Sequence, residues 1–253
     1  MLSNKIYLDE KIIISKYLKK LNFNKEGTYK FQNDASFLKT FKNKIIVTTD
    51  SISEKIDFFK NDNPRSIANK ITTCNLSDLS AMGAYPYAYT LNLFLPKYID
   101  HSWLEKFTDE LFNIQKKLNF YLLGGDLSKA NNLSLSATFF GFSTKKIISQ
   151  NNINLDDDIW ITGNIGDSYV GLQLLKKNIK IKNKLFTNYF LKKYYYPEPC
   201  MIGSKISNYV RSMKDISDGF LTDLKKMLND KYGAQIILEK VPLSLKLKYL
   251  VKN

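Results

Sequence analysis

The alternation of apolar and polar residues predicts a mixture of strands and helices in the first part of the chain. Residues 10–21 place their apolar side chains at helical spacing, on one side of a helix. Other segments are short, β-branched or alternate with a period of two, which is typical of strands. These predicted strands are residues 42–50, 88–95, 120–126 and 133–142.

Two longer amphipathic segments lie between these strands and have helix start and stop signals. The first opens with Asp62 or Asn63 as N-cap, continues with a proline in its first turn, and ends at Gly83. The second starts at Ser102, with Glu105 at capping-box spacing. The resulting order of elements predicts an α/β or mixed α+β fold for the first domain.

A second unit is expected to start near residue 150, after the polar segment "STKKIISQNNINLDD". Residues 159–163 are predicted as a strand, "NIGDS" as a turn and residues 169–177 as a helix. We therefore divide the chain into two domains, 1–145 and 146–253.

Composition narrows the possible functions. The chain has 253 residues and is 44% hydrophobic, which is enough for one large core or two moderate ones. Its two cysteines, Cys74 and Cys200, give neither a disulfide framework nor a zinc-ligand spacing. The one histidine, His101, argues against histidine-based metal sites and leaves little room for a Ser/His/Asp triad. No apolar run approaches the ~20 residues of a membrane span, and the N-terminus does not resemble a signal peptide, so a cytoplasmic protein is expected.

The formal charge of +14 raises the question of a nucleic-acid partner. The lysines are scattered, and the chain is rich in Lys, Asn and Ile, as an AT-rich coding sequence would produce. No clustered basic stripe with interleaved aromatic residues is present. We therefore attribute the charge to composition and expect no nucleic-acid partner.

Aspartates recur at or near the ends of the predicted strands. Asp78 is an exception, because it projects from a helix between apolar neighbours. Carboxylates crowded into a partly dry site repel one another unless a cation neutralises them, and an all-oxygen set favours Mg²⁺. Taken singly, each aspartate is better explained as a turn former or N-cap than as a metal ligand. The set is Asp34, Asp50, Asp78, Asp126, Asp215 and Asp218.

Two glycine-containing stretches also suggest a ligand. Gly124 and Gly125 precede Asp126 and would allow a ligand to approach the backbone closely. "GNIGDS" lies at a predicted helix start and could offer N–H groups to an anion, but on its own it is better explained as a tight turn.

Five segments together resemble the thiamine-monophosphate kinase family, within the superfamily of aminoimidazole ribonucleotide synthetase and selenophosphate synthetase. They occur in the order "VTTDSISEKIDFF", "NLSDLSAMGA", "LLGGDLS", "ITGNIGDSYVGLQLL" and "DISDGFLTDL". The resemblance extends from about residue 30 to about residue 244. The combination of Gly-Gly-Asp with Asp-Ile-Ser-Asp-Gly favours the thiamine branch over selenophosphate synthetase.

The resemblance implies a two-domain fold like that of aminoimidazole ribonucleotide synthetase, with an N-terminal domain that binds ATP and Mg²⁺ and forms a homodimer. It implies ATP-dependent conversion of thiamine phosphate to thiamine diphosphate, by direct transfer assisted by several Mg²⁺ ions. By the same resemblance, Asp57 lies near substrate. The implied Mg²⁺ ligands are Asp34, Thr49, Asp50, Asp78, Asp126, Asp215 and Asp218, and the implied nucleotide contacts are Gly125, Asp126, Gln150 and Ser217.

The chain departs from the family pattern at several positions. Asn33 replaces one acid of a Gly-Asp-Asp motif, Asp57 replaces a histidine, and Gln150 replaces an arginine. Family members also continue beyond the position of Asn253, so an incomplete second domain with exposed sheet edges is expected. Two alternatives to the kinase therefore stay open: a non-catalytic relative that binds nucleotide, and an ATP-dependent enzyme of the same superfamily with another acceptor.

Overall fold

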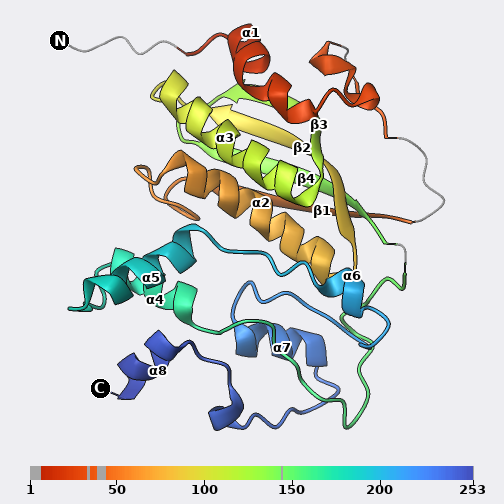
Figure 1. The fold of residues 1–253 in the computed structure, drawn as a ribbon, viewed down its shortest axis with the longest axis vertical. Coiled ribbons are helices and arrows are strands. Elements are labelled where there is room, and N and C mark those ends of the chain that lie inside the picture. The colour runs from red at the N-terminus through yellow and green to blue at the C-terminus, as the bar shows by residue number, and fades with distance from the viewer. Residues whose placement is uncertain (1–6, 33–34, 39–43, 144, 253) are drawn as a thin grey trace.

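The computed structural model describes residues 7–32, 35–38, 44–143 and 145–252 (Figure 1). Its centre is a four-stranded sheet with the strand order β1-β4-β2-β3. β4 runs antiparallel to both β1 and β2, whereas β2 and β3 are parallel. The strands are β1 (Ile45–Ser53), β2 (Tyr85–Leu95), β3 (Tyr121–Lys129) and β4 (Ser134–Phe142), which confirms the four strands predicted in this part of the chain.

Two long helices, α2 (Pro64–Ala81) and α3 (His101–Leu118), cover one face of this sheet (Figure 1). Asn63 caps α2, because its side chain accepts a hydrogen bond from the Arg65 amide at 3.0 Å. The N-cap predicted for the second helix at Ser102 is wrong. Asp100 caps α3 instead, since its carboxylate accepts from the Trp103 amide at 2.8 Å and the helix starts one residue later.

The main core lies between these helices and the sheet. Alternate residues of each strand point into it, so that the next residue points to the opposite face. In β4, for example, Leu135, Ala137 and Phe139 are buried, while their neighbours are only partly so. The helices contribute Ile67, Ile71, Leu76, Leu79, Leu104, Phe107 and Leu111, and β2 contributes Tyr89, Leu91 and Leu93.

The N-terminal segment packs on this layer as a series of short turns rather than as one regular helix. The predicted apolar side of residues 10–21 is confirmed, because Ile13, Tyr17, Leu18 and Leu21 are buried. Its elements are α1 (Glu10–Ile12), the π-helical turn η1 (Ile13–Leu18) and the 3₁₀ turns η2 (Lys19–Asn22) and η3 (Glu26–Phe31).

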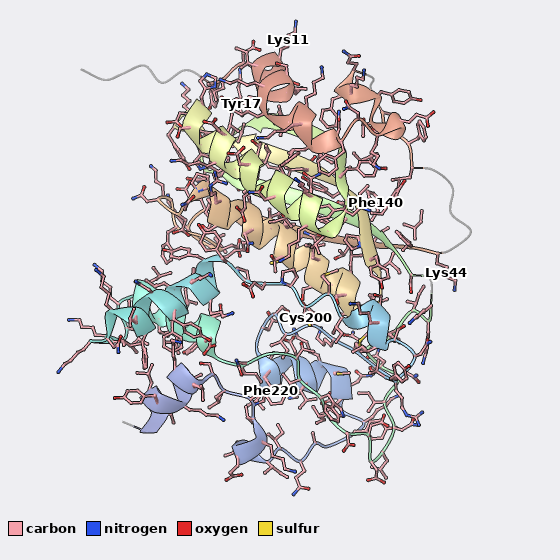
Figure 2. The ribbon with its side chains drawn as sticks, in the orientation of Figure 1. Lys11, Tyr17, Lys44, Phe140, Cys200 and Phe220 are labelled. Carbon is pink, nitrogen blue, oxygen red and sulfur yellow. The ribbon has the colours of Figure 1, made fainter. Side chains whose placement is uncertain are left out.

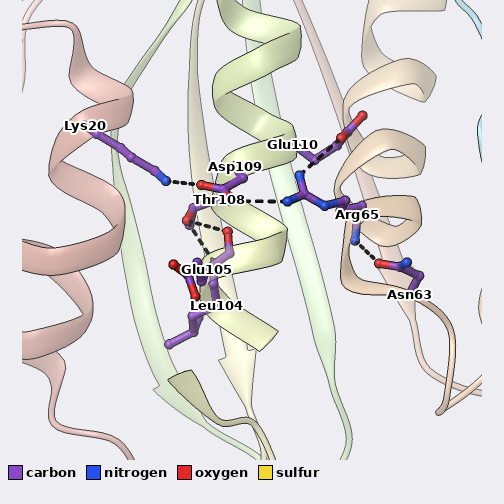
Figure 3. A network of polar contacts seen from close by, with 8 residues as sticks. All are labelled: Lys20, Asn63, Arg65, Leu104, Glu105, Thr108, Asp109 and Glu110. Atoms are coloured by element: carbon purple, nitrogen blue, oxygen red, sulfur yellow. Dashed lines mark hydrogen bonds and ion pairs between the residues drawn. The ribbon is translucent and has the colours of Figure 1, made fainter. Parts of the chain in front are cut away.

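A polar network ties this segment to both helices (Figure 3). The Lys20 ammonium lies 2.6 Å from one oxygen of Asp109 in α3, and the Arg65 guanidinium of α2 lies 3.2 Å from the other. Arg65 also reaches Glu110 at 3.8 Å. The hydrogen bond and the charge of Lys20, and then the charge of Arg65, hold the pKa of Asp109 below its usual value. Because these groups are partly exposed, they fix the orientation of the elements more than they add stability.

Residues 145–252 are helical and irregular. The strand predicted at residues 159–163 is wrong, and within residues 145–252 the structure describes helices but no strand. A strand requires a partner backbone, and here Trp160 stays 89% exposed. The sheet edges expected in this part therefore do not arise among its described residues. Its elements are α4 (Asp167–Leu175), α5 (Lys184–Tyr195), α6 (Gly203–Ile206), α7 (Phe220–Leu228), η4 (Leu238–Lys240) and α8 (Leu245–Lys252).

This second part contacts the first at the C-terminal end of α2. The Ser80 hydroxyl donates to the Cys200 carbonyl at 2.6 Å and accepts from the Gly203 amide at 3.2 Å, and Figure 2 labels Cys200 at this junction. A Cβ at Gly203 would lie 1.7 Å from the Ser80 carbonyl oxygen, so the two segments are in close contact. Within the described ranges, no helix has both the length and the apolar character that crossing a membrane requires.

Candidate functional site

Asp50 lies on β1 with its side chain on the face that α2 and α3 cover. It is half-buried, and its Oδ2 atom is buried without a hydrogen-bond partner. Burial and, after it, the negative charges of Asp78 and Asp215 together raise the pKa of Asp50 from 3.8 to about 6. A carboxylate oxygen left in this state is a position where a cation would be stabilised.

Asp78 projects from α2 toward the same strand. The Thr48 hydroxyl donates to its Oδ2 at 2.6 Å, so β1 fixes the direction of this carboxylate. Cys74 lies one turn earlier on α2 and borders the same acids. Part of its side chain remains exposed. Removal from water and, after it, the charges of Asp50, Asp78 and Asp215 together raise the pKa of the Cys74 thiol to about 11, against the opposing charge of Lys70. The thiol therefore stays protonated and is no nucleophile at neutral pH.

Asp215 brings a third carboxylate from the segment before α7. Its pKa is raised by burial and then by the charge of Asp78, while Lys214 acts in the opposite direction. Three separate segments thus direct negative charge to one region. Even so, among the residues that the structure describes, no three His, Cys, Asp or Glu side chains converge closely enough to form a finished metal-ligand group. Asp34, the sixth predicted acid, lies outside the described residues.

The donor set of this region fits a hard divalent cation. Asp50, Asp78 and Asp215 offer carboxylate oxygens, and one of these oxygens is buried and unpartnered. Carboxylates supplemented by water and substrate phosphate are the ligands that Mg²⁺ takes in proteins. The mutual repulsion of the acids is what such an ion would relieve.

Asp126 and Thr49 lie on the opposite face of the sheet from Asp50. Asp126 pairs with Asn92, whose neighbours Leu91 and Leu93 point into the core. The Thr49 hydroxyl donates to the Ala137 carbonyl at 3.1 Å and accepts from the Thr138 hydroxyl at 3.1 Å. The predicted ligands are therefore divided between two faces, a division that their spacing along the chain does not indicate.

Gly125 is required by the sheet itself. Its φ is +157°, and a Cβ there would lie 1.9 Å from the Leu91 carbonyl oxygen of β2. The sequence predicts glycines here because a ligand approaches the backbone, but the structure shows that the neighbouring strand makes this close approach. The exposed Asp126 that follows accepts a hydrogen bond from the Ser128 hydroxyl at 2.9 Å.

Ser217 and Asp218 are exposed in the loop that precedes α7. Lys226 of α7 forms a hydrogen-bonded ion pair with Asp218 and thereby holds the pKa of that carboxyl below its usual range. The amides of both loop residues donate to Asp223, a buried carboxylate that our sequence reasoning missed. Its signal is present in "SDGFLTD", where an acid stands in the first turn of a helix.

The structure does not bring the two remaining predicted residues into the acidic region. The Asp57 carboxylate accepts from the Ser53 amide at 2.7 Å, and its carbonyl accepts from the Lys70 ammonium at 2.6 Å. Gln150 is exposed in a segment whose neighbour Ser149 accepts from the Ser212 hydroxyl at 2.9 Å, three residues before Asp215. Asp57 therefore stabilises its own turn, and Gln150 lies beside the segment that leads to the site.

Comparison with known proteins gives a consistent result. Residues 32–143 match the family described as AIR synthase related protein, N-terminal domain. The thiamine-monophosphate kinase of Buchnera aphidicola from Acyrthosiphon pisum is 39% identical over 246 residues, which cover 95% of this chain and 75% of that protein.

Solved structures agree in fold. The thiamine-monophosphate kinase of Stenotrophomonas maltophilia superposes with a TM-score of 0.78 at 28% identity, covering 87% of this chain and 71% of that one. AaThiL, solved in complex with AMPPCP and TMP, gives a TM-score of 0.78 at 25% identity and covers 86% of this chain and 70% of that one. The mixed α/β fold predicted from the sequence is thereby confirmed, and the chain belongs to the thiamine-monophosphate kinase family.

Proposed function

We infer that this chain transfers the γ-phosphoryl group of ATP to thiamine monophosphate, giving ADP and thiamine diphosphate. The observation that carries this function is the convergence of Asp50, Asp78 and Asp215 from three segments, in a chain of this family. The related AaThiL was solved with AMPPCP and TMP, a nucleotide and a substrate together. Phosphoryl transfer between two phosphates needs positioning and charge neutralisation more than covalent chemistry.

Several Mg²⁺ ions are part of this proposal. Asp50, Asp78 and Asp215 would hold Mg²⁺ on the helix-covered face, and Asp126 with Thr49 would hold it on the other. When bound, Mg²⁺ neutralises the phosphate oxygens and orients them for in-line transfer. Asp34 and Asp218 complete the proposed set of ligands, and Lys226 holds the Asp218 side chain by an ion pair.

The described residues suggest how the chain divides the remaining tasks. Thr48 holds the Asp78 carboxylate toward β1, and the high pKa of Cys74 keeps a neutral thiol beside the acids. We assign no residue a covalent step. In this proposal the phosphate of thiamine monophosphate accepts the γ-phosphoryl group of ATP directly. We keep Gly125, Asp126, Gln150 and Ser217 as nucleotide contacts. We also keep Asp57 as a residue near the substrate. Because its carboxylate is engaged by the Ser53 amide, the backbone of its turn would face the substrate.

We propose two domains: residues 1–145, which carry the other ligands of nucleotide and Mg²⁺ and the dimer face, and residues 146–253, which add Gln150, Asp215, Ser217 and Asp218. The family match over residues 32–143 supports this boundary. Both cysteines are free thiols, which suits the reducing cytoplasm that the sequence predicts.

We expect two copies to associate through the sheet face that α2 and α3 leave uncovered. Apolar side chains stand exposed on that face, with Ile45 42%, Val47 56% and Tyr85 37% exposed. Thr49 and Asp126 lie on the same face, so a second copy would close over the nucleotide contacts. Sedimentation of the purified chain should give a dimer at micromolar concentration, and Val47→Glu should give a monomer because it buries an unpaired charge. A monomeric parent would contradict this proposal.

The kinase function is tested by measuring thiamine diphosphate formation from ATP, Mg²⁺ and thiamine monophosphate. Asp126→Asn should lower kcat about 100-fold with the thermal unfolding temperature unchanged, because a proposed ligand on an exposed surface is lost. Asp230→Asn, an exposed aspartate after α7, is the matched control and should retain full activity. Near-normal turnover by Asp126→Asn would remove Asp126 from the site.

A nucleotide-binding relative without turnover is the second candidate. The engaged carboxylate of Asp57 and the exposed position of Gln150 favour it, because neither side chain is held toward the acids. Mg²⁺-dependent nucleotide binding without product would support this candidate. Product with a different phosphorylated acceptor would instead indicate a superfamily enzyme with another substrate.

A further inference from the structure

The loop that carries Ser217 and Asp218 is held by one buried carboxylate. Asp223, in the first turn of α7, is only 2% exposed. Its Oδ2 atom accepts hydrogen bonds from three successive amides: Ser217 at 2.9 Å, Asp218 at 2.8 Å and Gly219 at 3.1 Å. Its own amide donates to the Gly219 carbonyl at 2.9 Å, which closes the first turn of the helix.

This arrangement holds the loop before α7 and is not a helix cap, because the three amides that donate to Asp223 all precede the helix. The N-cap residue Gly219 has no side chain to satisfy the first amides of α7, and its φ of +126° suits only glycine. A carboxylate that accepts several amides forms charge-assisted hydrogen bonds, which are shorter and stronger than neutral ones. The backbone path of residues 217–219 is therefore set by Asp223.

Lys226 extends the same anchor to the Asp218 side chain. Its ammonium is paired with the Asp218 carboxylate and lies 3.6 Å from Oδ1 of Asp223. Asp223 therefore holds Asp218 in two ways: directly, through the Asp218 amide, and indirectly, through Lys226, which pairs with the Asp218 carboxylate. Asp223 itself lies between the loop amides and Lys226.

We propose that Asp223 is a positioning residue, which fixes the loop so that Ser217 and Asp218 meet the nucleotide and its Mg²⁺. This inference rests on the proposed nucleotide site. It also says how Ser217 makes its contact: the amides of residues 217–219 are already used by Asp223, so they are not free for a phosphate. Ser217 is therefore left with its hydroxyl and its carbonyl oxygen for contact with the nucleotide.

The test measures nucleotide binding separately from catalysis. Affinity for a non-hydrolysable ATP analogue with Mg²⁺ is measured by calorimetry for the parent, Asp223→Ala, Asp223→Asn and the exposed control Asp230→Ala. Asp223→Ala should weaken binding about 10- to 100-fold, as loss of a residue that orients ligands does. Asp223→Asn retains one acceptor oxygen and should restore part of that affinity, while the KM for thiamine monophosphate stays unchanged in both variants.

Amide hydrogen exchange of the loop provides the second measurement. Residues 217–219 should lose protection in Asp223→Ala and keep most of it in Asp223→Asn. Equal analogue affinity in parent and Asp223→Ala, with lost protection, would overturn the proposal, because the loop would then not matter for binding. A parent that binds the analogue but makes no product would contradict the kinase function alone, whereas a parent that binds no analogue would overturn both.

Discussion

Asp50→Asn is expected to lower kcat about 1,000-fold. The same substitution should raise the free energy of unfolding of the metal-free protein. The loss of turnover follows because Asp50 is the central acid of the site: its pKa responds to both Asp78 and Asp215. A metal site lowers the free energy of the transition state by several kcal/mol. Loss of one ligand that removes about 4 kcal/mol of this stabilisation lowers the rate about 1,000-fold.

The gain in stability follows from the raised pKa of Asp50. Folding moves this pKa from 3.8 to about 6, so the folded protein holds the proton more tightly than the unfolded chain does. Stability from this group is therefore full below about pH 4 and is lost as the pH rises from about 4 to about 6. The full shift corresponds to about 3 kcal/mol, and solvent screening of a half-exposed carboxylate reduces this to about 1 kcal/mol.

Denaturant unfolding in EDTA at pH 4 and pH 8 distinguishes these expectations. Asp50→Asn should match the parent at pH 4 and exceed it by about 1 kcal/mol at pH 8. Asp230→Asn, at an exposed position, should match the parent at both values. A variant that is less stable than the parent at pH 8 would show that the Asp50 carboxylate is not strained by its acidic neighbours.

The sequence predicted the layer of strands and helices well, because buried faces leave a periodic signal. The strands at Asp50 and Asp126 and the helix that carries Asp78 are where their apolar alternation indicates. The charges of Asp78 and Asp215 act on Asp50, but among the described residues these three carboxylates do not form a metal-ligand group. Convergence is a property of the tertiary fold, and only a resemblance to known motifs could suggest it beforehand.

The errors have equally specific causes. The side on which Asp126 lies depends on a register irregularity at Tyr89 and Thr90, and a shift of one residue exchanges the faces of a strand. Residues 159–163 have strand composition, but propensity without a pairing partner does not form a sheet. Asp223 was missed because a buried acid that caps a loop has the same residue type as an exposed one.

Gly125→Ala is expected to destabilise the protein by more than about 3 kcal/mol, since it combines a backbone clash with a strained conformation. The new Cβ would lie 1.9 Å from the Leu91 carbonyl oxygen, a backbone atom in the middle of β2. Relief requires β3 to move away from β2, which would break their parallel pairing around Asn92 and Asp126. We therefore expect this substitution to lower kinase activity through displacement of Asp126, in addition to its effect on unfolding.

The neighbouring Gly124 offers a matched control in the same strand. A Cβ at Gly124 would meet only the Ser36 hydroxyl, at 3.3 Å, and a side-chain contact of this kind can adjust. Gly124→Ala should therefore cost less than about 1 kcal/mol in the same urea titration, with the same slope against denaturant. If both variants lost equal stability, the special role of Gly125 would be wrong, and β3 would have to lie against Leu91 in another register. A large loss for Gly125→Ala alone would instead establish that this glycine is present for the sheet, and that Asp126 owes its direction to the strand geometry that Gly125 permits.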